Sequence, residues 1–448
     1  MSKKDIKIKK NMSPVKVLSL GYLITIAIGT ILLLMPFASN TGKTTFIEAI
    51  FTATSAVCVT GLTVVNTLEH FTLFGKIVII SLIQIGGLGF MTIVTLLFMM
   101  IGKKISIYNQ TIMIQSSGSY TISEVKKLII IIVVGTVLFE GIGAYLIYLI
   151  ISPTYGDKAI FYGIFHSISA FCNAGFDVFG DSLAPMNTNH WLLIVIMALI
   201  VIGGSGFILW NDLIDSKFKF KRLKLHSKIV LVFNLIIIVV PALLFLLFEF
   251  TKIGTSGHFI DMNIKDKIVN AFFLSVTPRT AGFYSLDVNE LTSSGKILTV
   301  ILMAIGGNSG STAGGLKVTT FVVVIANLVS QMRGQKDVVL FKKQISNSVI
   351  RQSSALLISF IILILFASLL ITTFDNFSFE QIIFEVVSAV CTVGLTSGVS
   401  AAGNLFTKII LILLMYAGRL GTLTLLSVFV KEKKATALQE PIGKIIVG

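Results

Sequence analysis

The chain has 448 residues, of which 54% are hydrophobic and only 13% are charged, and its net charge is +15. A soluble chain carries roughly a quarter charged residues, so this one has too few polar side chains to cover a globule in water. The composition argues against a soluble enzyme, a nucleic-acid-binding domain and a disordered protein. Apolar runs of about 20 residues, the length that crosses a bilayer core, recur along the chain and predict a polytopic α-helical membrane protein.

Most of the positive charge lies in a few short segments. Five segments hold 25 of the 36 Lys and Arg residues, and the stretches between them carry acids such as Asp177, Asp261 and Asp375. Because basic loops stay in the cytoplasm, we expect a multi-pass protein of the cell membrane with both termini and three loops in the cytoplasm, and a mildly acidic outer face. The five segments are Lys3 to Lys16, Lys103 to Lys127, Lys217 to Lys228, Arg333 to Arg351 and Lys431 to Lys444.

One order of segments occurs four times along the chain. The first apolar stretch, Val17 to Phe37, is predicted to be a spanning helix, because it is too long for a signal-peptide core and lacks an Ala-x-Ala cleavage site. Each unit then has an outer loop, a shorter and more polar helix, a glycine turn and a second long apolar helix. We therefore expect eight spanning helices and four re-entrant helices around a central pore. The four units cover residues 1–103, 104–221, 222–333 and 334–448, the last with a cytoplasmic C-terminal tail.

The shorter helices align on one glycine, which follows a Phe by ten residues in every unit. All three cysteines of the chain lie three residues before this glycine, and Arg279 takes that place in the third unit. An odd number of cysteines at equivalent positions argues against disulfides, so we interpret them as small apolar residues packed at helix ends. The aligned glycines are Gly61, Gly175, Gly282 and Gly394, and the cysteines are Cys58, Cys172 and Cys391.

Glycines also recur in the second long helix of each unit, where the motif begins at Gly86, Gly203, Gly306 and Ala417. In the first two units these small residues predict close helix packing. The third unit differs, because residues 306–315 contain five glycines, two serines, a threonine and an asparagine. Irregular backbone inside a membrane is tolerated only where it lines a cavity or is buried in protein. We therefore interpret 306–315 as a broken helix that lines a pore.

Four short helices, each followed by a glycine turn, can together form an ion site. A helix of roughly 12 residues is about 18 Å long, too short to cross the membrane, and its C-terminal end carries partial negative charge that favours a cation. The residues before each glycine can present carbonyl oxygens that replace the hydration shell of potassium, and glycine permits the backbone conformation that this needs. The predicted selectivity filter consists of Val59, Thr60, Gly61, Asn173, Ala174, Gly175, Thr280, Ala281, Gly282, Thr392, Val393 and Gly394.

Arg419 lies in the last apolar helix, where the spacing aligns it with Leu88, Ser205 and Asn308 of the other units. A cation below the filter repels a permeating ion, so we interpret Arg419 as part of a gate. The alternative is a buried arginine that binds the backbone carbonyls freed by the broken helix. The predicted gate consists of Gly306, Gly307, Asn308, Ser309, Gly310, Ser311, Thr312, Ala313, Gly314, Gly315 and Arg419.

Three other ionisable residues lie close to these motifs. We expect Glu140, within an apolar helix, to make a helix-packing hydrogen bond. Arg279 is expected to pair with an acid near the outer mouth, and Asp177, two residues past Gly175, to attract cations there.

The sequence offers no catalytic arrangement. Its five histidines are scattered without metal-ligand spacing, and Lys317 is followed by Val318, so the glycine-rich segment is not a nucleotide-binding loop. An ATP-driven pump would need a cytosolic domain of about 100 residues or more, which the short polar segments do not supply. We expect a protein that is not an enzyme and holds no organic cofactor.

Together these motifs resemble the Trk/Ktr/HKT superfamily of potassium transporters, and most closely the KtrB type of bacterial membrane subunit. The resemblance covers nearly the whole chain. It implies a homodimer with one pore in each protomer, a cytosolic ring of Rossmann-like subunits that binds the regulatory nucleotide, and potassium uptake that is commonly sodium-dependent. It also implies that the aligned glycines form the filter, that 306–315 is the gating loop and that Arg419 is the pore arginine. In related plant transporters a Ser at the first filter glycine accompanies sodium selectivity, so Gly61 favours potassium.

Two other classes of function are open. A secondary cation transporter with alternating access often has inverted repeats, whereas every unit here begins on the cytoplasmic side, which suits a central pore. A structural or enzymatic membrane protein without ion permeation is the third possibility, and ion flux in liposomes separates it from the other two.

Overall fold

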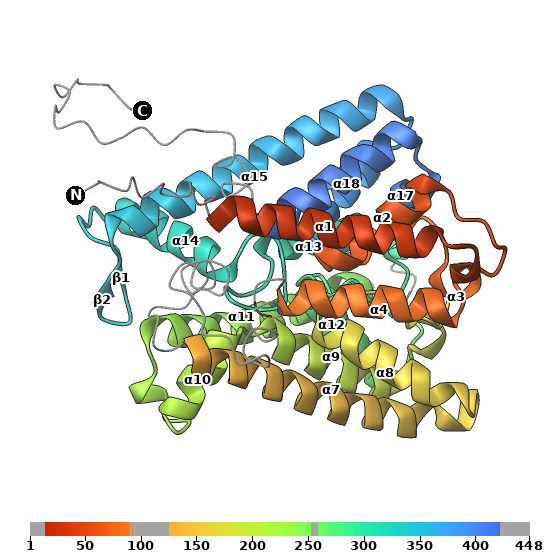
Figure 1. The fold of residues 1–448 in the computed structure, drawn as a ribbon. Coiled ribbons are helices and arrows are strands. Elements are labelled where there is room, and N and C mark those ends of the chain that lie inside the picture. The colour runs from red at the N-terminus through yellow and green to blue at the C-terminus, as the bar shows by residue number, and fades with distance from the viewer. Residues whose placement is uncertain (1–13, 90–91, 93–124, 252–258, 422–448) are drawn as a thin grey trace, which may run out of the picture.

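The computed structural model describes residues 14–89, 92, 125–251 and 259–421, and this part of the chain is almost entirely helical (Figure 1). Within these described ranges, four helices are long and apolar enough to cross a membrane. Each lies where the sequence predicts the first apolar helix of a unit. They are α1 (Pro14–Leu34), α7 (Val125–Tyr155), α11 (Leu225–Glu249) and α15 (Asn347–Phe374).

The second apolar helix of each unit is shorter than predicted. Besides the expected break in the third unit, the second unit has one, because α10 (Phe207–Asp215) leaves the preceding helix at 83°. The sequence did not predict this second break, although the close packing expected of the glycines in the first two units does occur at Gly86 and Gly203. In the third unit, residues 306–317 separate the helix from α14 (Val318–Met332). The four helices are α4 (Leu73–Leu88), α9 (His190–Gly204), α13 (Ser293–Ile305) and α18 (Leu405–Leu420).

The same residue types begin and end these four helices. Each begins after a Thr or Asn whose side chain accepts a backbone N–H of the first turn, namely Thr72, Asn189, Thr292 and Asn404. Seventeen residues later, Gly89, Gly206 and Gly421 have φ of 83°, 96° and 85°, which ends the helix or turns the chain. The corresponding helix of the third unit ends three residues earlier in this count, at Gly306, whose φ is 68°.

This register corrects the predicted alignment of Arg419. Counted from the residue that caps each helix, Gly418 is equivalent to Gly86, Gly203 and Gly306. Arg419 therefore corresponds to Gly87, Gly204 and Gly307, and not to the residues one place further along the chain. The motif in the last unit begins with Ala417, which hides the true alignment in the sequence.

The short helices are 12 to 14 residues long, as predicted, and each packs between the two apolar helices of its own unit. The second apolar helix of each unit also packs against the short helix of the next, and α18 packs against the first short helix, which closes a circle. Ser19 and Tyr416 join the first and last units through hydroxyl groups 2.6 Å apart. The short helices are α2 (Phe46–Cys58), α8 (Lys158–Phe171), α12 (Ile264–Val276) and α16 (Phe379–Val390).

A proline in α11 frees a backbone carbonyl oxygen, and this oxygen accepts a hydrogen bond from the short helix α12. Pro241 lies within α11 and has no N–H, so the Ile237 carbonyl lacks its partner in the helix. The Ser275 hydroxyl of α12 is 3.1 Å from this oxygen and 2.7 Å from the Ile238 carbonyl oxygen. α11 and α12 are therefore joined by side chain to backbone hydrogen bonds as well as by apolar packing.

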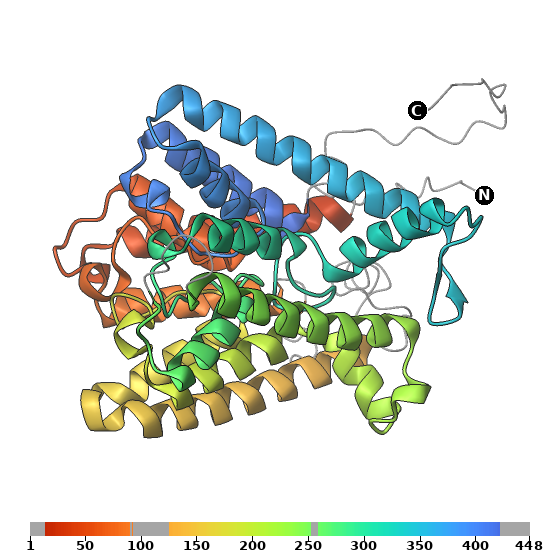
Figure 2. The ribbon, with the colours of Figure 1, turned by 180° about the vertical axis from the view of Figure 1, so that it is seen from behind.

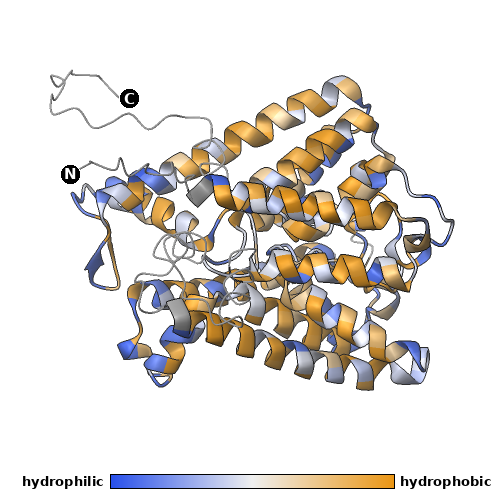
Figure 3. Ribbon diagram, in the orientation of Figure 1, coloured by the Kyte–Doolittle hydropathy of each residue, from blue (hydrophilic) through white to orange (hydrophobic). Residues whose placement is uncertain are grey.

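Figures 1 and 2 show the ribbon from the front and from behind. The ribbon is apolar along its helices and polar at their ends (Figure 3). The described basic segments 217–228 and 333–351 lie at the end where α1 begins, and the second includes a hairpin of β1 (Val339–Leu340) and β2 (Lys343–Gln344). Lys3 to Lys10, residues 103–124 and the segment Lys431 to Lys444 lie outside the described residues. The remaining short elements are η1 (Pro36–Ala38), α3 (Thr67–His70), η2 (Ala184–Met186), η3 (Phe220–Arg222), η4 (Val288–Glu290) and α17 (Val399–Ala402).

Candidate functional site

The four aligned glycines meet in a closed ring, although more than 100 residues separate each from the next. A methyl group built on Gly61, Gly175, Gly282 or Gly394 would lie 2.9–3.2 Å from the Cα atom of the next glycine around the ring, with Gly394 next to Gly61. All four glycines are buried. The structure therefore brings together the four positions that the sequence pattern singles out.

Carbonyl oxygens lie beside every glycine of the ring. The nearest atom to a methyl group on Gly175 would be the Ala281 carbonyl oxygen, at 2.7 Å, and the other three glycines have the corresponding neighbour. Since real side chains essentially never approach so closely, no residue larger than glycine fits without a shift of the backbone. The four oxygens belong to Thr60, Ala174, Ala281 and Val393, each the residue before its glycine.

A second feature of the ring is a left-handed residue two places before each glycine. Val59, Asn173, Thr280 and Thr392 have φ of 56°, 59°, 68° and 52°. This conformation is unfavourable for β-branched residues such as Val and Thr, and strained backbone of this kind clusters at functional sites. The glycines themselves also have positive φ, from 69° to 98°. The chain therefore turns sharply in the same way at the end of all four short helices.

Side chains of the short helices hold the turns in place. The Ser55 and Ser388 hydroxyls accept the N–H groups of Gly61 and Gly394 over 3.0 and 3.1 Å. In the second unit the Ser169 hydroxyl donates to the Phe176 carbonyl oxygen over 2.7 Å. These bonds fix the backbone on the helix side and occupy two of the glycine N–H groups. Within the described part of the chain the buried hydroxyls of Thr60 and Thr392 have no partner, so they add polar oxygens at the ring.

The non-helical segment 306–317 packs against the ends of the short helices. The Thr312 hydroxyl donates to the Phe171 carbonyl oxygen over 3.1 Å, and a methyl group on Gly315 would lie 2.6 Å from the Cys391 carbonyl oxygen. A methyl group on Gly307 would lie 3.7 Å from the Thr280 hydroxyl, which belongs to the predicted filter. The predicted gate segment therefore lies directly beside the ring.

Two cations bind the backbone of this segment. Lys317 donates to the carbonyl oxygens of Ala313 and Gly314 over 2.8 and 2.9 Å, and so closes the segment on itself. The Arg419 guanidinium donates to the Thr312 carbonyl oxygen over 2.6 Å and to the Gly86 carbonyl oxygen at the end of α4. Arg419 thus binds backbone carbonyls, as the alternative interpretation expected, and it does so on the predicted gate segment.

The structure shows the contacts of the three other ionisable residues that the sequence singled out. Glu140 accepts from the Gln84 amide over 3.1 Å, which matches the expected hydrogen bond between helices. Arg279 donates to the Asn234 side-chain oxygen, and no carboxylate among the described residues lies within 4.0 Å of it, so the expected acid is not found there. The Asp177 carboxylate accepts the N–H groups of Phe179 and Gly180 over 2.9 and 2.7 Å.

Sequence reasoning missed two polar residues behind the ring. Nine residues before the aligned glycine, His166 and Glu385 are fully buried. His166 accepts the Val178 N–H over 3.3 Å, and Glu385 accepts the N–H groups of Ser397 and Ser400 over 2.9 and 3.0 Å. A polar residue directly after the aligned Phe, within a buried helix, was the available signal.

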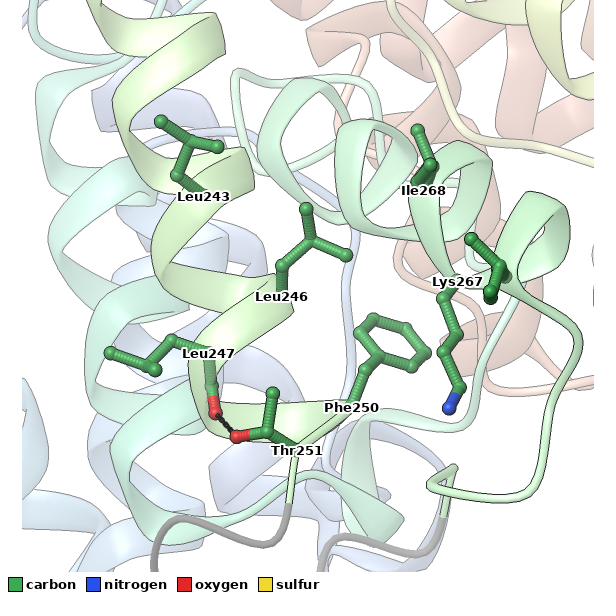
Figure 4. Close-up of a pocket in the computed structure, with 8 residues that line it drawn as sticks. Leu243, Leu246, Leu247, Phe250, Thr251, Lys267 and Ile268 are labelled. Carbon is green, nitrogen blue, oxygen red and sulfur yellow. Dashed lines mark hydrogen bonds between the residues drawn. The ribbon is translucent and has the colours of Figure 1, made fainter.

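An apolar pocket between α11 and α12 lies apart from this site (Figure 4). Leu243, Leu246, Leu247 and Phe250 line it, and the Lys267 side chain lies at its edge. Such a lining offers few oxygen atoms to a cation, so this pocket is not a candidate ion site.

The sequence and the fold are both similar to those of known cation transport proteins. Residues 6–439 match the family model TrkH, described as a cation transport protein. The chain is 40% identical to the potassium/sodium uptake protein NtpJ of Enterococcus hirae, across 99% of both chains. It is 37% identical to the Ktr system potassium uptake protein B of Bacillus subtilis, across 97% of both. The crystal structure of the potassium transporter TrkH from Vibrio parahaemolyticus matches with a TM-score of 0.73 at 18% identity, over 95% of this chain and 86% of that one.

Proposed function

Because this chain belongs to the TrkH family of cation transport proteins, we propose that it is the ion-translocating membrane subunit of a bacterial potassium uptake system. The family is one of membrane transporters, so the chain is not an enzyme, as the sequence predicted. Its relatives are named for the uptake of potassium, or of potassium and sodium, which makes these two ions the candidate cargo.

The observation that carries the proposal is the closed ring of four glycines with a carbonyl oxygen beside each. In this proposal, Val59 to Gly61 and the equivalent residues of the other units form a selectivity filter. Carbonyl oxygens in a ring can replace the water around a dehydrated potassium ion. The fixed turns keep these oxygens in place, so the protein need not rearrange when the ion arrives.

The arrangement of the units supports a channel-like pathway through the centre. In this proposal, residues 1–103, 104–221, 222–333 and 334–448 each contribute a helix that spans the membrane, a short helix that enters from the outer face, and a second apolar helix, which is followed by a break in the second and third units. The described basic segments lie at one end of the molecule, which we assign to the cytoplasm together with both termini. A secondary transporter with alternating access is the alternative, but four units related by a circular order favour one central pathway over a rocking mechanism.

The intramembrane segment is proposed as the gate. It lies beside the filter residues, and Arg419 adds a positive charge that repels a cation. By the resemblance to Ktr systems, we propose a homodimer and a cytosolic ring of Rossmann-like, nucleotide-binding subunits as the parts that move this segment. Sodium dependence of uptake is proposed on the same basis.

Rubidium flux into liposomes tests the proposal. Purified protein should admit radioactive rubidium, with potassium competing better than sodium, and choline should not compete. Deletion of Ser309 to Ser311 should raise the flux if the segment is the gate, and addition of the regulatory ring with nucleotide should change it. Rubidium entry equal to that of protein-free liposomes would contradict the proposal.

A further inference from the structure

Asn234 links the third turn of the ring to the intramembrane segment through one oxygen atom. It lies in the middle of α11 and is 8% exposed. Its side-chain oxygen accepts from the Arg279 guanidinium and, over 3.1 Å, from the Asn308 amide. Arg279 lies three residues before Gly282, and Asn308 lies two residues into the segment 306–315. The two elements of the proposed pathway therefore share a single acceptor.

Among the described residues the Arg279 guanidinium has no second acceptor, whereas the Asn308 amide has one other. Arg279 is 5% exposed, its Nε atom has no partner within the described ranges, and no described carboxylate pairs with it. Asn308 is fully buried and donates besides only to the Gly204 carbonyl oxygen, over 2.8 Å. A buried donor that loses its acceptor is costly, and a charged donor is costlier. The Asn234 oxygen has two lone pairs and accepts from both donors at once, so it joins Arg279 to Asn308.

Of the three residues, Asn308 is the one that belongs to the segment 306–315. Asn234 and Arg279 belong to α11 and to the turn after α12, and Ser275 joins these two helices by its bonds to Ile237 and Ile238. Asn308, by contrast, follows Gly307 in a segment without regular helix. A displacement of the segment 306–315 would withdraw the Asn308 amide and leave the Asn234 oxygen to Arg279 alone.

We propose that Asn234 is a positioning residue that couples the conformation of the segment 306–315 to the third turn of the ring. The inference rests on the proposed function and deepens it. When Asn308 leaves, the Asn234 oxygen keeps only its bond to the Arg279 guanidinium, and the backbone that leads to Gly282 responds. Coupling between two sites is reciprocal, so an ion held at the ring also biases the position of the segment.

This coupling can be tested with a variant that breaks a different contact of the segment 306–315, the hydrogen bond between Arg419 and Thr312. Arg419→Ala removes the bond to Thr312, so it should raise the maximal rate of rubidium uptake into liposomes and also shift the half-saturating rubidium concentration. Coupled sites typically shift affinity by about fivefold or more. In the Asn234→Leu background, Arg419→Ala should still raise the maximal rate, but the shift in half-saturation should disappear. Asn234→Asp keeps an acceptor oxygen for both donors and should restore the shift.

Gln84→Leu is the matched control, because it removes another side-chain amide contact between helices, to Glu140, that does not involve the segment. In the Gln84→Leu background, Arg419→Ala should still shift the half-saturating rubidium concentration. An equal shift with and without Asn234 would overturn the inference while leaving the proposed function intact. If Asn234→Leu does not fold, Asn308→Leu removes the same contact from the side of the segment and should abolish the shift. Wild-type protein that admits no rubidium would contradict the proposed function, and the inference with it.

Discussion

The Arg419 guanidinium donates to the Thr312 carbonyl oxygen over 2.6 Å, and so ties the last apolar helix to the segment that interrupts the third unit. The same guanidinium donates to the Gly86 carbonyl oxygen at the end of α4. One side chain therefore joins the first, third and fourth units beside the ring. In the other units the equivalent residues are Gly87, Gly204 and Gly307, so this connection occurs once.

Arg419→Ala should increase rubidium flux. A hydrogen bond to a charged group contributes about 1.5–3 kcal/mol, so its loss should favour displacement of the segment about tenfold or more. The rate of rubidium uptake into liposomes measures this. Lys408→Ala removes another cation from the same helix and serves as the control, with flux near that of the wild type. Equal flux in both variants would exclude Arg419 from gating.

Gly61→Ser should weaken discrimination between potassium and sodium. Gly61 has φ of 92°, and a side chain there would meet the carbonyl oxygen of Ala174, so the ring must shift to admit it. Competition of sodium with rubidium uptake measures the change. Gly156→Ser is the control, because Gly156 also has positive φ, at 52°, but has nothing within 4 Å of the added atom. Unaltered competition in Gly61→Ser would count against the filter assignment.

Two fully buried carboxylates can be compared, because one contacts the residues after a glycine of the ring and the other contacts the start of α13. Glu385 accepts two N–H groups from the residues after Gly394, whereas Glu249 accepts the N–H and hydroxyl of Thr292 at the start of α13. A Gln at either position turns an amide toward N–H donors, and should lower the free energy of unfolding by about 1–3 kcal/mol.

The two variants should differ in ion selectivity. Glu385→Gln is expected to weaken discrimination between potassium and sodium because the backbone behind Gly394 loses its acceptor. Glu249→Gln should leave discrimination unchanged, since α13 begins away from the ring. Thermal unfolding and sodium competition, measured on both, give the comparison. If both variants alter selectivity equally, Glu385 has no special role at the ring.

Rubidium uptake should fall as the external pH falls. Burial raises the pKa of the Asp177 carboxyl above its ordinary value, although the N–H groups of Gly180 and Phe179 lower it in part. This carboxyl therefore binds a proton at a higher pH than an exposed Asp does, and it loses its negative charge, at the proposed outer mouth, as the solution becomes acidic. Asp177→Asn should have lower uptake at low rubidium and a flatter pH profile. Asp261→Asn, at an exposed outer position, should keep the wild-type profile.

The sequence predicted the elements that repeat. The aligned glycines are separated by 107 to 114 residues, and this spacing located four short helices and the ring that their ends form. Hydropathy located the four long helices, because a span of about 20 apolar residues is a strong signal. The segment 306–315 stood out by composition, since so many small and polar residues are rare at membrane depth.

Other features depend on contacts that a single sequence does not reveal. The left-handed conformation of Val59, Thr280 and Thr392 contradicts the preference of β-branched residues and is held by the surrounding packing. The partner of Arg279 is an amide, where charge alone suggested an acid. The break after α9 was missed because Gly203 and Gly204 are also typical of close helix packing, and Gly203 does approach the Phe171 backbone closely.

A structure with thallium, which resembles potassium and scatters anomalously, tests the central claim most directly. The measurement is the anomalous density around the ring in crystals grown with thallium. The account predicts a peak on the axis of the ring, among the carbonyl oxygens of Thr60, Ala174, Ala281 and Val393. Thallium bound elsewhere along the chain, with no density at the ring, would contradict it.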